Sequence, residues 1–265
     1  MNKRNIIINS TLLFVIAFLW QTTLHELAHF ITATLLHAKD VKLYHNYANY
    51  DSTSLSDKSL LIIAAAGPMF SLFIGFLFNL FCAAYKKRNS LFLFSLYMSS
   101  FGYICFGGYL LIAPFFENGD TGFVFKQLGF PIWSIYGIAA LGFGFILFIG
   151  KFIGKYFAEM ANTEIMSDQK QLKTFADNII KFPLYIGVVL VTLLNLPVVS
   201  FLSLMYPLFN PMNLFWIYGY AIDKPYPTTH ANMEFDKLQK LQPVLFVVFI
   251  ITIAINRLLV YGFHF

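Results

Sequence analysis

Two histidines and one glutamate stand in the order His25-Glu26-Leu27-Ala28-His29, inside an otherwise apolar stretch that covers residues 6–36. Residues four apart on an α-helix are separated by roughly 40° around its axis, so both imidazole rings project from one face. This spacing lets a helix present two nitrogen ligands to one zinc ion, and it keeps Glu26 close enough to take a proton from water at the metal. Ionisable residues are costly inside an apolar helix, so these three indicate a functional site.

The composition is typical of a membrane protein. Of the 265 residues, 58% are hydrophobic and only 12% are charged, whereas soluble domains contain about 25% charged residues. Apolar blocks long enough to cross a bilayer alternate with short charged stretches, which predicts an integral, multi-pass location in the lipid bilayer. The net charge of +5 is spread over the loops. It suits contact with anionic lipid headgroups, and because there is no basic stripe we expect no nucleic-acid partner.

The apolar blocks predict an all-α fold, a polytopic membrane bundle of about six transmembrane helices. Their expected ranges are residues 6–36, 59–85, 91–115, 131–157, 183–206 and 243–263. We divide the chain into a catalytic membrane core of three spans, residues 1–130, and an additional three-span membrane region, residues 131–265.

The segments between the spans have their own patterns. Residues 37–58 are polar with alternating tyrosines, which indicates a short loop in the form of a β-hairpin. Residues 158–181 have the pattern of a charged amphipathic helix, and residues 207–221 are apolar but too short to span, as in a re-entrant or interfacial segment. Residues 222–242 contain two prolines and several charges, so we expect a polar linker there.

Following the chain through the predicted spans brings three sequence features to one membrane face. The first span ends on the side opposite the N-terminus, and His25 lies near that end. The second span begins on that side, so Gly67-Pro68 lies about two turns deep from the same face. The third span ends there and delivers Glu117, Asn118 and Asp120. This convergence predicts a shared site.

A catalytic zinc ion usually has three protein ligands and keeps a fourth position for water. The third ligand is therefore expected to be a histidine or a carboxylate on the same face, with Asp120 as the first candidate and Glu117 as the second. In this site a single zinc ion acidifies water, while Glu26 acts as general base and later gives the proton to the leaving amine. Asn118 is placed to donate a hydrogen bond to the substrate or to the developing oxyanion, and Gly67 and Pro68 are expected to shape the same region.

Three motifs resemble those of the site-2 protease family of intramembrane zinc metalloproteases. The first is the segment from His25 to His29, and the second is Ala66-Gly67-Pro68. The third ends the third span: Leu110-Leu111-Ile112-Ala113-Pro114-Phe115-Phe116-Glu117-Asn118-Gly119-Asp120-Thr121-Gly122. The resemblance covers about residues 6–125. It implies that His25, His29 and Asp120 bind zinc and that Glu26 is the catalytic carboxylate.

The chain departs from the family pattern in two motifs. In the third motif Gly119 stands between Asn118 and Asp120 in place of a proline, and Thr121 separates Asp120 from the following glycine. In the second motif Ser71 stands where the family often has an asparagine.

The leading expectation is an intramembrane zinc metalloendopeptidase that cleaves membrane-anchored protein substrates in or near their spans. One alternative is a membrane zincin of the prenyl-protein protease type, whose third ligand would be Glu159 or Glu164, although both follow the fourth span and so lie on the other face. A second alternative is a metal-binding membrane protein without turnover. Cys82 and Cys105 are expected to be buried small apolar residues. The sequence contains no signal for an oligomeric state.

Overall fold

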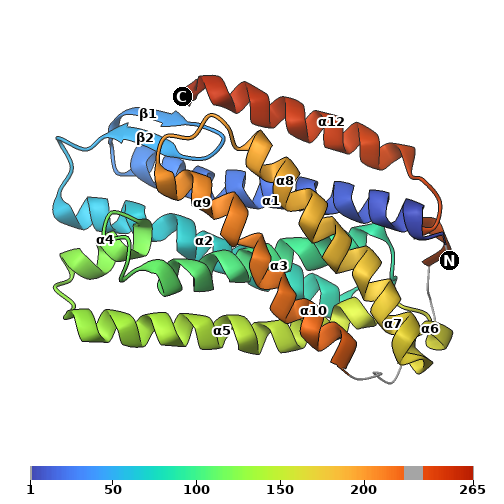
Figure 1. The fold of residues 1–265 in the computed structure, drawn as a ribbon. Coiled ribbons are helices and arrows are strands. Elements are labelled where there is room, and N and C mark those ends of the chain that lie inside the picture. Colours follow the sequence, from blue (N-terminus) through green and yellow to red (C-terminus); the bar gives the residue numbers. More distant parts are fainter. Residues whose placement is uncertain (1, 224–234, 265) are drawn as a thin grey trace.

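The computed structural model describes residues 2–223 and 235–264. Six of the described helices are long and apolar enough to cross a membrane, which agrees with the predicted number. They lie alongside one another, and a small sheet covers one end of the bundle (Figure 1). The fold is therefore mostly helical, with one short β element.

The first three long helices are α1 (Lys3–Leu35), α2 (Asp57–Ala84) and α3 (Ser90–Ile112), and they pack against one another. In α1 and α3, 72% and 78% of the most apolar segment is buried, compared with 17–39% in the other four long helices. The two buried helices thus form the centre of the bundle. The outer helices expose large apolar side chains on their outward faces, an arrangement that suits contact with lipid.

Close packing at the centre depends on aromatic rings and on one glycine. Phe14 and Phe18 of α1 meet Phe101 of α3 edge to face, with ring centroids 5.0 and 5.4 Å apart. At Gly102 a Cβ atom would lie 2.6 Å from the carbonyl oxygen of Ser71. Because glycine has no side chain, α2 and α3 approach closely enough to bring Ser71 toward α1.

Helix α2 continues through Pro68 without a break. Proline has no amide hydrogen for the carbonyl four residues earlier, which here belongs to Ala64. The long apolar helix on both sides keeps the segment helical despite this missing hydrogen bond. The preceding carbonyl, that of Ile63, accepts a hydrogen bond from the His29 side chain.

The loop after α1 forms the expected hairpin. Strands β1 (Lys39–Leu43) and β2 (Ala48–Asp51) pair antiparallel. A third strand, β3 (Phe263–His264), pairs with the other edge of β1 and gives the order β2-β1-β3. This third strand had no signal in the sequence, because its partner is more than 200 residues away.

After α3 the chain makes a tight turn, the short helix α4 (Asp120–Gln127) and the long helix α5 (Ile132–Ala158), which packs along α3. At the other end of α5, Glu159 accepts a hydrogen bond from Arg88 at 2.9 Å, and both side chains are buried. The end of α5 that precedes Glu159 lies at the end of the molecule opposite the hairpin, as do α6 and α7 (Figure 1).

The fifth long helix differs from the predicted range 183–206. Helices α6 (Thr163–Ser167) and α7 (Gln169–Ala176) occupy the expected amphipathic segment, but α7 continues through a π-helical turn, η1 (Asp177–Lys181), into α8 (Phe182–Leu194). Pro183 leaves the carbonyl of Ile179 without its helical donor, and the hydroxyl of Tyr97 donates to that carbonyl instead. The helix therefore passes through the proline, and the apolar helix covers Gln169–Leu194.

The rest of the chain folds back across the bundle. Helix α9 (Phe201–Phe209) begins within the range predicted for the fifth span. The 3-10 turn η2 (Pro211–Asn213) and α10 (Leu214–Asp223) occupy most of residues 207–221, the segment expected to be too short to span. Most of the predicted linker, residues 224–234, lies outside the described residues. The described chain then ends with α11 (Phe235–Leu238), α12 (Pro243–Leu258), the 3-10 turn η3 (Leu259–Tyr261) and β3.

Hydrogen bonds tie the hairpin to the turn between α8 and α9. His45 Nε2 and Asn46 Nδ2 donate to the carbonyl of Asn195 at 2.9 and 3.0 Å. From α12, Arg257 donates to the carbonyls of Leu194 and Leu196. Three segments that are distant in sequence thus share one group of backbone acceptors, which we call the Asn195 junction.

Candidate metal centre

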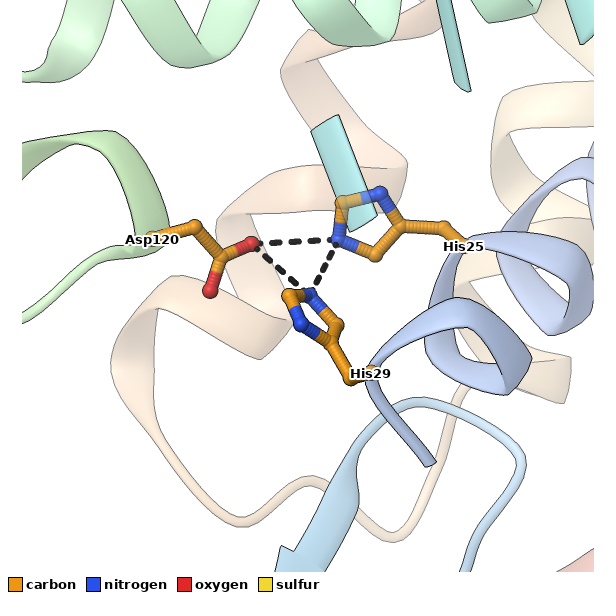
Figure 2. A group of neighbouring side chains, drawn as sticks. All are labelled: His25, His29 and Asp120. Carbon is orange, nitrogen blue, oxygen red and sulfur yellow. Dashed lines mark hydrogen bonds and ion pairs between the residues drawn. The ribbon is translucent and has the colours of Figure 1, made fainter. Parts of the chain in front are cut away.

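Helix α1 and the start of α4 bring together three atoms that could ligate a metal ion, as Figure 2 shows. His25 Nε2 lies 3.1 Å from Asp120 Oδ2, and His29 Nε2 lies 3.2 Å from the same oxygen. The two histidine nitrogens are 3.2 Å apart. Both imidazoles are buried, and the carboxylate is partly buried. The site thus contains the two histidines predicted from their spacing and the first of the two carboxylate candidates.

The other nitrogen of each ring is fixed by a neighbour on α2. His29 Nδ1 lies 2.7 Å from the carbonyl oxygen of Ile63, which can only accept, so Nδ1 of the neutral ring carries the proton. His25 Nδ1 lies 3.0 Å from Ser71 Oγ. In the tautomer that donates to Ser71 through Nδ1, Nε2 is the acceptor in this ring as well. Three atoms with lone pairs then face one another, an arrangement that a cation would stabilise.

The donor set and its dimensions fit a small divalent ion. A tetrahedral zinc ion with bonds of about 2.0–2.1 Å keeps its ligand atoms about 3.3–3.4 Å apart. The three observed separations of 3.1–3.2 Å are close to that value. Two imidazoles and one carboxylate are also a common ligand set for catalytic zinc. His25, His29 and Asp120 could therefore hold a metal ion.

Asp120 reaches the histidines because the chain turns sharply after α3. It is the first residue of α4, directly after Gly119. The Thr121 hydroxyl donates to the carbonyl of Tyr109 at 2.6 Å, which fastens the start of α4 to α3. Burial would raise the pKa of the Asp120 carboxyl, but the positive charge and the N–H groups that His29 and His25 present to it when they are protonated outweigh burial and hold its pKa well below the usual value. A bound cation would take the place of those protons.

Glu26 lines the same cavity as the three ligating residues. The cavity has a volume of about 740 Å³ and lies between α1, α3, α4, α9 and the hairpin. The backbone of Ala48, at the start of β2, lines this cavity close to the Glu26 carboxylate. The hairpin thus forms part of the immediate surroundings of Glu26. A carboxylate at this place can exchange a proton with water or with a ligand in the cavity.

Of the remaining predicted site residues, Gly67 and Asn118 lie at the site, whereas Glu117 does not. Gly67 lies against the ligands, since a Cβ atom there would be 2.2 Å from His29 Nε2, whereas Pro68 follows it within α2. Asn118 lines the cavity from the turn before α4. Glu117, the second ligand candidate, is exposed and accepts a hydrogen bond from Lys126 at 2.8 Å, outside the group of ligating atoms.

The carboxylates of the prenyl-protein protease alternative lie elsewhere. Glu159 is paired with Arg88 and also lies 3.9 Å from Lys155. Glu164 belongs to α6, at the end of the molecule opposite the hairpin (Figure 1). Within the described residues, neither belongs to the group that could hold a metal ion with His25 and His29.

Several neighbours of His25 were not identified from the sequence. Ser71 Oγ contacts His25 Nδ1 and also accepts from Gln21 Nε2 at 3.1 Å. Cys105 is buried as expected, but its Sγ lies 3.6 Å from His25 Nδ1, so it has a polar partner. The Tyr109 ring is stacked on the His25 ring, with centroids 5.1 Å apart. One signal was available: Gln21 precedes His25 by four residues and so lies on the same helix face.

Replacing Ser71 with alanine is expected to weaken metal binding about 10–100-fold, because the partner that orients His25 is removed while the ligands remain. Competition with a chromophoric chelator measures the change in zinc affinity. Ser95→Ala is the matched control, since among the described residues Ser95 donates to the carbonyl of Leu91 in its own helix and to no other group. Equal zinc affinities for the Ser71 and Ser95 variants would contradict an orienting role for Ser71.

Comparison with protein-family models, with curated proteins and with solved structures finds no match to this chain.

Proposed function

We propose that this protein is an intramembrane zinc metalloendopeptidase, similar in its chemistry to the site-2 protease family. The observation that carries the proposal is the convergence of His25 Nε2, His29 Nε2 and Asp120 Oδ2 within 3.2 Å of one another. These atoms come from two segments 91 or more residues apart in sequence. Glu26 lines the same cavity, so ligands and a proton carrier are available together.

His25, His29 and Asp120 are the residues that would hold the ion. When bound, zinc supplies Lewis-acid chemistry: it acidifies water and polarises a carbonyl group. Glu26 takes the proton as the water oxygen forms its bond to the carbonyl carbon of the peptide. It then gives that proton to the nitrogen as the C–N bond breaks, so a carboxylic acid and an amine are released and Glu26 is unchanged.

The surroundings of the cavity favour a substrate in a membrane. The outer long helices turn large apolar side chains outward, and six helices are apolar enough to span. A membrane-anchored protein would bring its own apolar span to this surface. Its peptide bond becomes accessible only after local unwinding, because the amides of an intact helix are hydrogen-bonded internally. The polar wall of the cavity, which includes Asn46 and Asn118, offers partners for such an unwound segment.

Metal removal provides the direct test. We expect the purified protein in proteoliposomes to cleave tagged single-span proteins from a mixed panel. This cleavage should stop after treatment with the chelator 1,10-phenanthroline and resume when zinc is returned. Product is measured by gel mobility and mass spectrometry, and bound metal by elemental analysis. Cleavage that persists in metal-free protein would contradict the proposal. One zinc per chain without cleavage of any panel member would instead favour a metal-binding protein without turnover.

A further inference from the structure

Tyr109 occupies a fixed position beside the candidate metal centre. Its ring lies parallel to that of His25, with centroids 5.1 Å apart and an angle of 8° between the planes. Its backbone carbonyl accepts the hydrogen bond from Thr121, the residue after Asp120. Tyr109 therefore contacts one ligand with its ring and holds the segment of another with its backbone.

The hydroxyl of Tyr109 is available for a ligand. Within the described part of the chain it makes no hydrogen bond, and Tyr109 lines the cavity that Glu26 and Asp120 also line. Both carboxylates lie within electrostatic range of it. Two other tyrosines of the bundle differ in this respect. The Tyr206 hydroxyl donates to Gln21 Oε1 at 2.7 Å, and the Tyr97 hydroxyl donates to the carbonyl of Ile179.

We propose that Tyr109 is a catalytic residue whose hydroxyl donates a hydrogen bond to the carbonyl oxygen of the scissile peptide bond as that oxygen becomes negatively charged. This inference rests on the proposed peptidase function. The phenolic O–H is a donor, and a donor held rigidly in a water-poor site stabilises developing charge far better than a mobile one. The exposed Asn118, on the turn before α4, is less constrained. The Tyr109 ring is stacked on His25, and the Tyr109 backbone is fastened to the start of α4 by the Thr121 hydroxyl.

The step is balanced without any further reactant. Water adds to the carbonyl carbon, the C=O electron pair moves onto the oxygen, and the proton from water goes to Glu26. The Tyr109 hydroxyl keeps its own proton and shares it with the anionic oxygen. When the C–N bond breaks, the carbonyl re-forms and the hydrogen bond weakens again. Tyr109 thus stabilises the anionic oxygen of the reacting carbonyl and not the uncharged substrate. An interaction of this kind raises kcat, because it lowers the transition state more than the bound substrate.

The test is Tyr109→Phe, which keeps the stacked ring and removes only the hydroxyl. We expect kcat to fall about 10²–10³-fold, with KM and zinc content unchanged. Two further readouts do not depend on turnover. The affinity of a phosphinic-peptide analogue of the mapped cleavage site should fall by the same factor as kcat/KM. The affinity of uncleaved substrate, measured in a Glu26→Gln background, should not change.

Tyr103→Phe is the matched control, because Tyr103 lies on the same helix and does not line the cavity. It should retain wild-type kcat. Full activity of Tyr109→Phe with zinc bound would overturn the assignment while leaving the peptidase proposal intact. Loss of zinc from Tyr109→Phe would also overturn it, since the hydroxyl would then act on the ligands. A wild-type protein that cleaves no substrate would remove the peptidase proposal itself, and the role of Tyr109 with it.

Discussion

Replacing Glu26 with glutamine is expected to reduce peptide hydrolysis by about 10²–10⁴-fold, the contribution of a positioned general base. Glutamine has the same shape, but its amide cannot take a proton from water at neutral pH. The three ligating atoms belong to other residues, so zinc content should stay at the wild-type level. The expected result is therefore a folded, metal-loaded and inactive protein.

The measurement combines cleavage of a tagged single-span substrate with elemental analysis of the same preparation. Glu117→Gln is the matched control: Glu117 lies close in sequence to Asp120 but is exposed and paired with Lys126. We expect this control to keep full activity. If Glu26→Gln cleaved as fast as wild type, the proposed proton transfer would have to be abandoned, even with zinc in the site.

A side chain at position 67 is expected to abolish metal binding. A Cβ atom there would lie 2.2 Å from His29 Nε2 and 2.7 Å from His25 Nε2, well inside van der Waals contact. His29 cannot retreat freely, because its Nδ1 is bonded to the carbonyl of Ile63 on the same helix as Gly67. Gly67→Ala should therefore push the ligand nitrogens apart and reduce zinc from one ion per chain to near zero.

Elemental analysis after dialysis checks this result, and circular dichroism confirms that the helices are retained. The matched control is Gly144→Ala on α5, where a Cβ atom would meet nothing within 4 Å. That variant should bind zinc like the wild type. A Gly67→Ala protein with a full zinc complement would mean that the ligand geometry differs from the one described.

Much of the site could be predicted because its signals are local. The four-residue spacing places His25 and His29 on one helix face, whatever the rest of the fold does. Asp120 was predicted because the third apolar span ends on the membrane face near which His25 lies. Of the two carboxylates at that end, Asp120 and Glu117, Asp120 lies at the histidines. The choice between Asp120 and Glu117 depended on the turn geometry, which a three-residue separation does not reveal.

The parts that could not be predicted depend on contacts between distant segments. Ser71 and Tyr109 reach His25 because α2 and α3 pack closely on α1, and no pattern within either helix specifies that register. The fifth helix was misplaced for a similar reason. Pro183 suggests a helix start, but the Tyr97 hydroxyl from α3 occupies the carbonyl that the proline leaves free. Here a hydrogen bond from another helix outweighs the tendency of proline to mark the start of a helix.

The Asn195 junction has a consequence for how the cavity opens. The hairpin is hydrogen-bonded to the carbonyl of Asn195, and Arg257 donates hydrogen bonds to the carbonyls of Leu194 and Leu196 on either side of that residue. The hairpin therefore cannot swing outward as an independent flap. Any widening on that side is a concerted displacement of hairpin, interhelical turn and last helix, a class of motion that takes microseconds to milliseconds. The rate at which a substrate enters the cavity is thus coupled to Arg257, which lies 228 positions after His29 in the sequence.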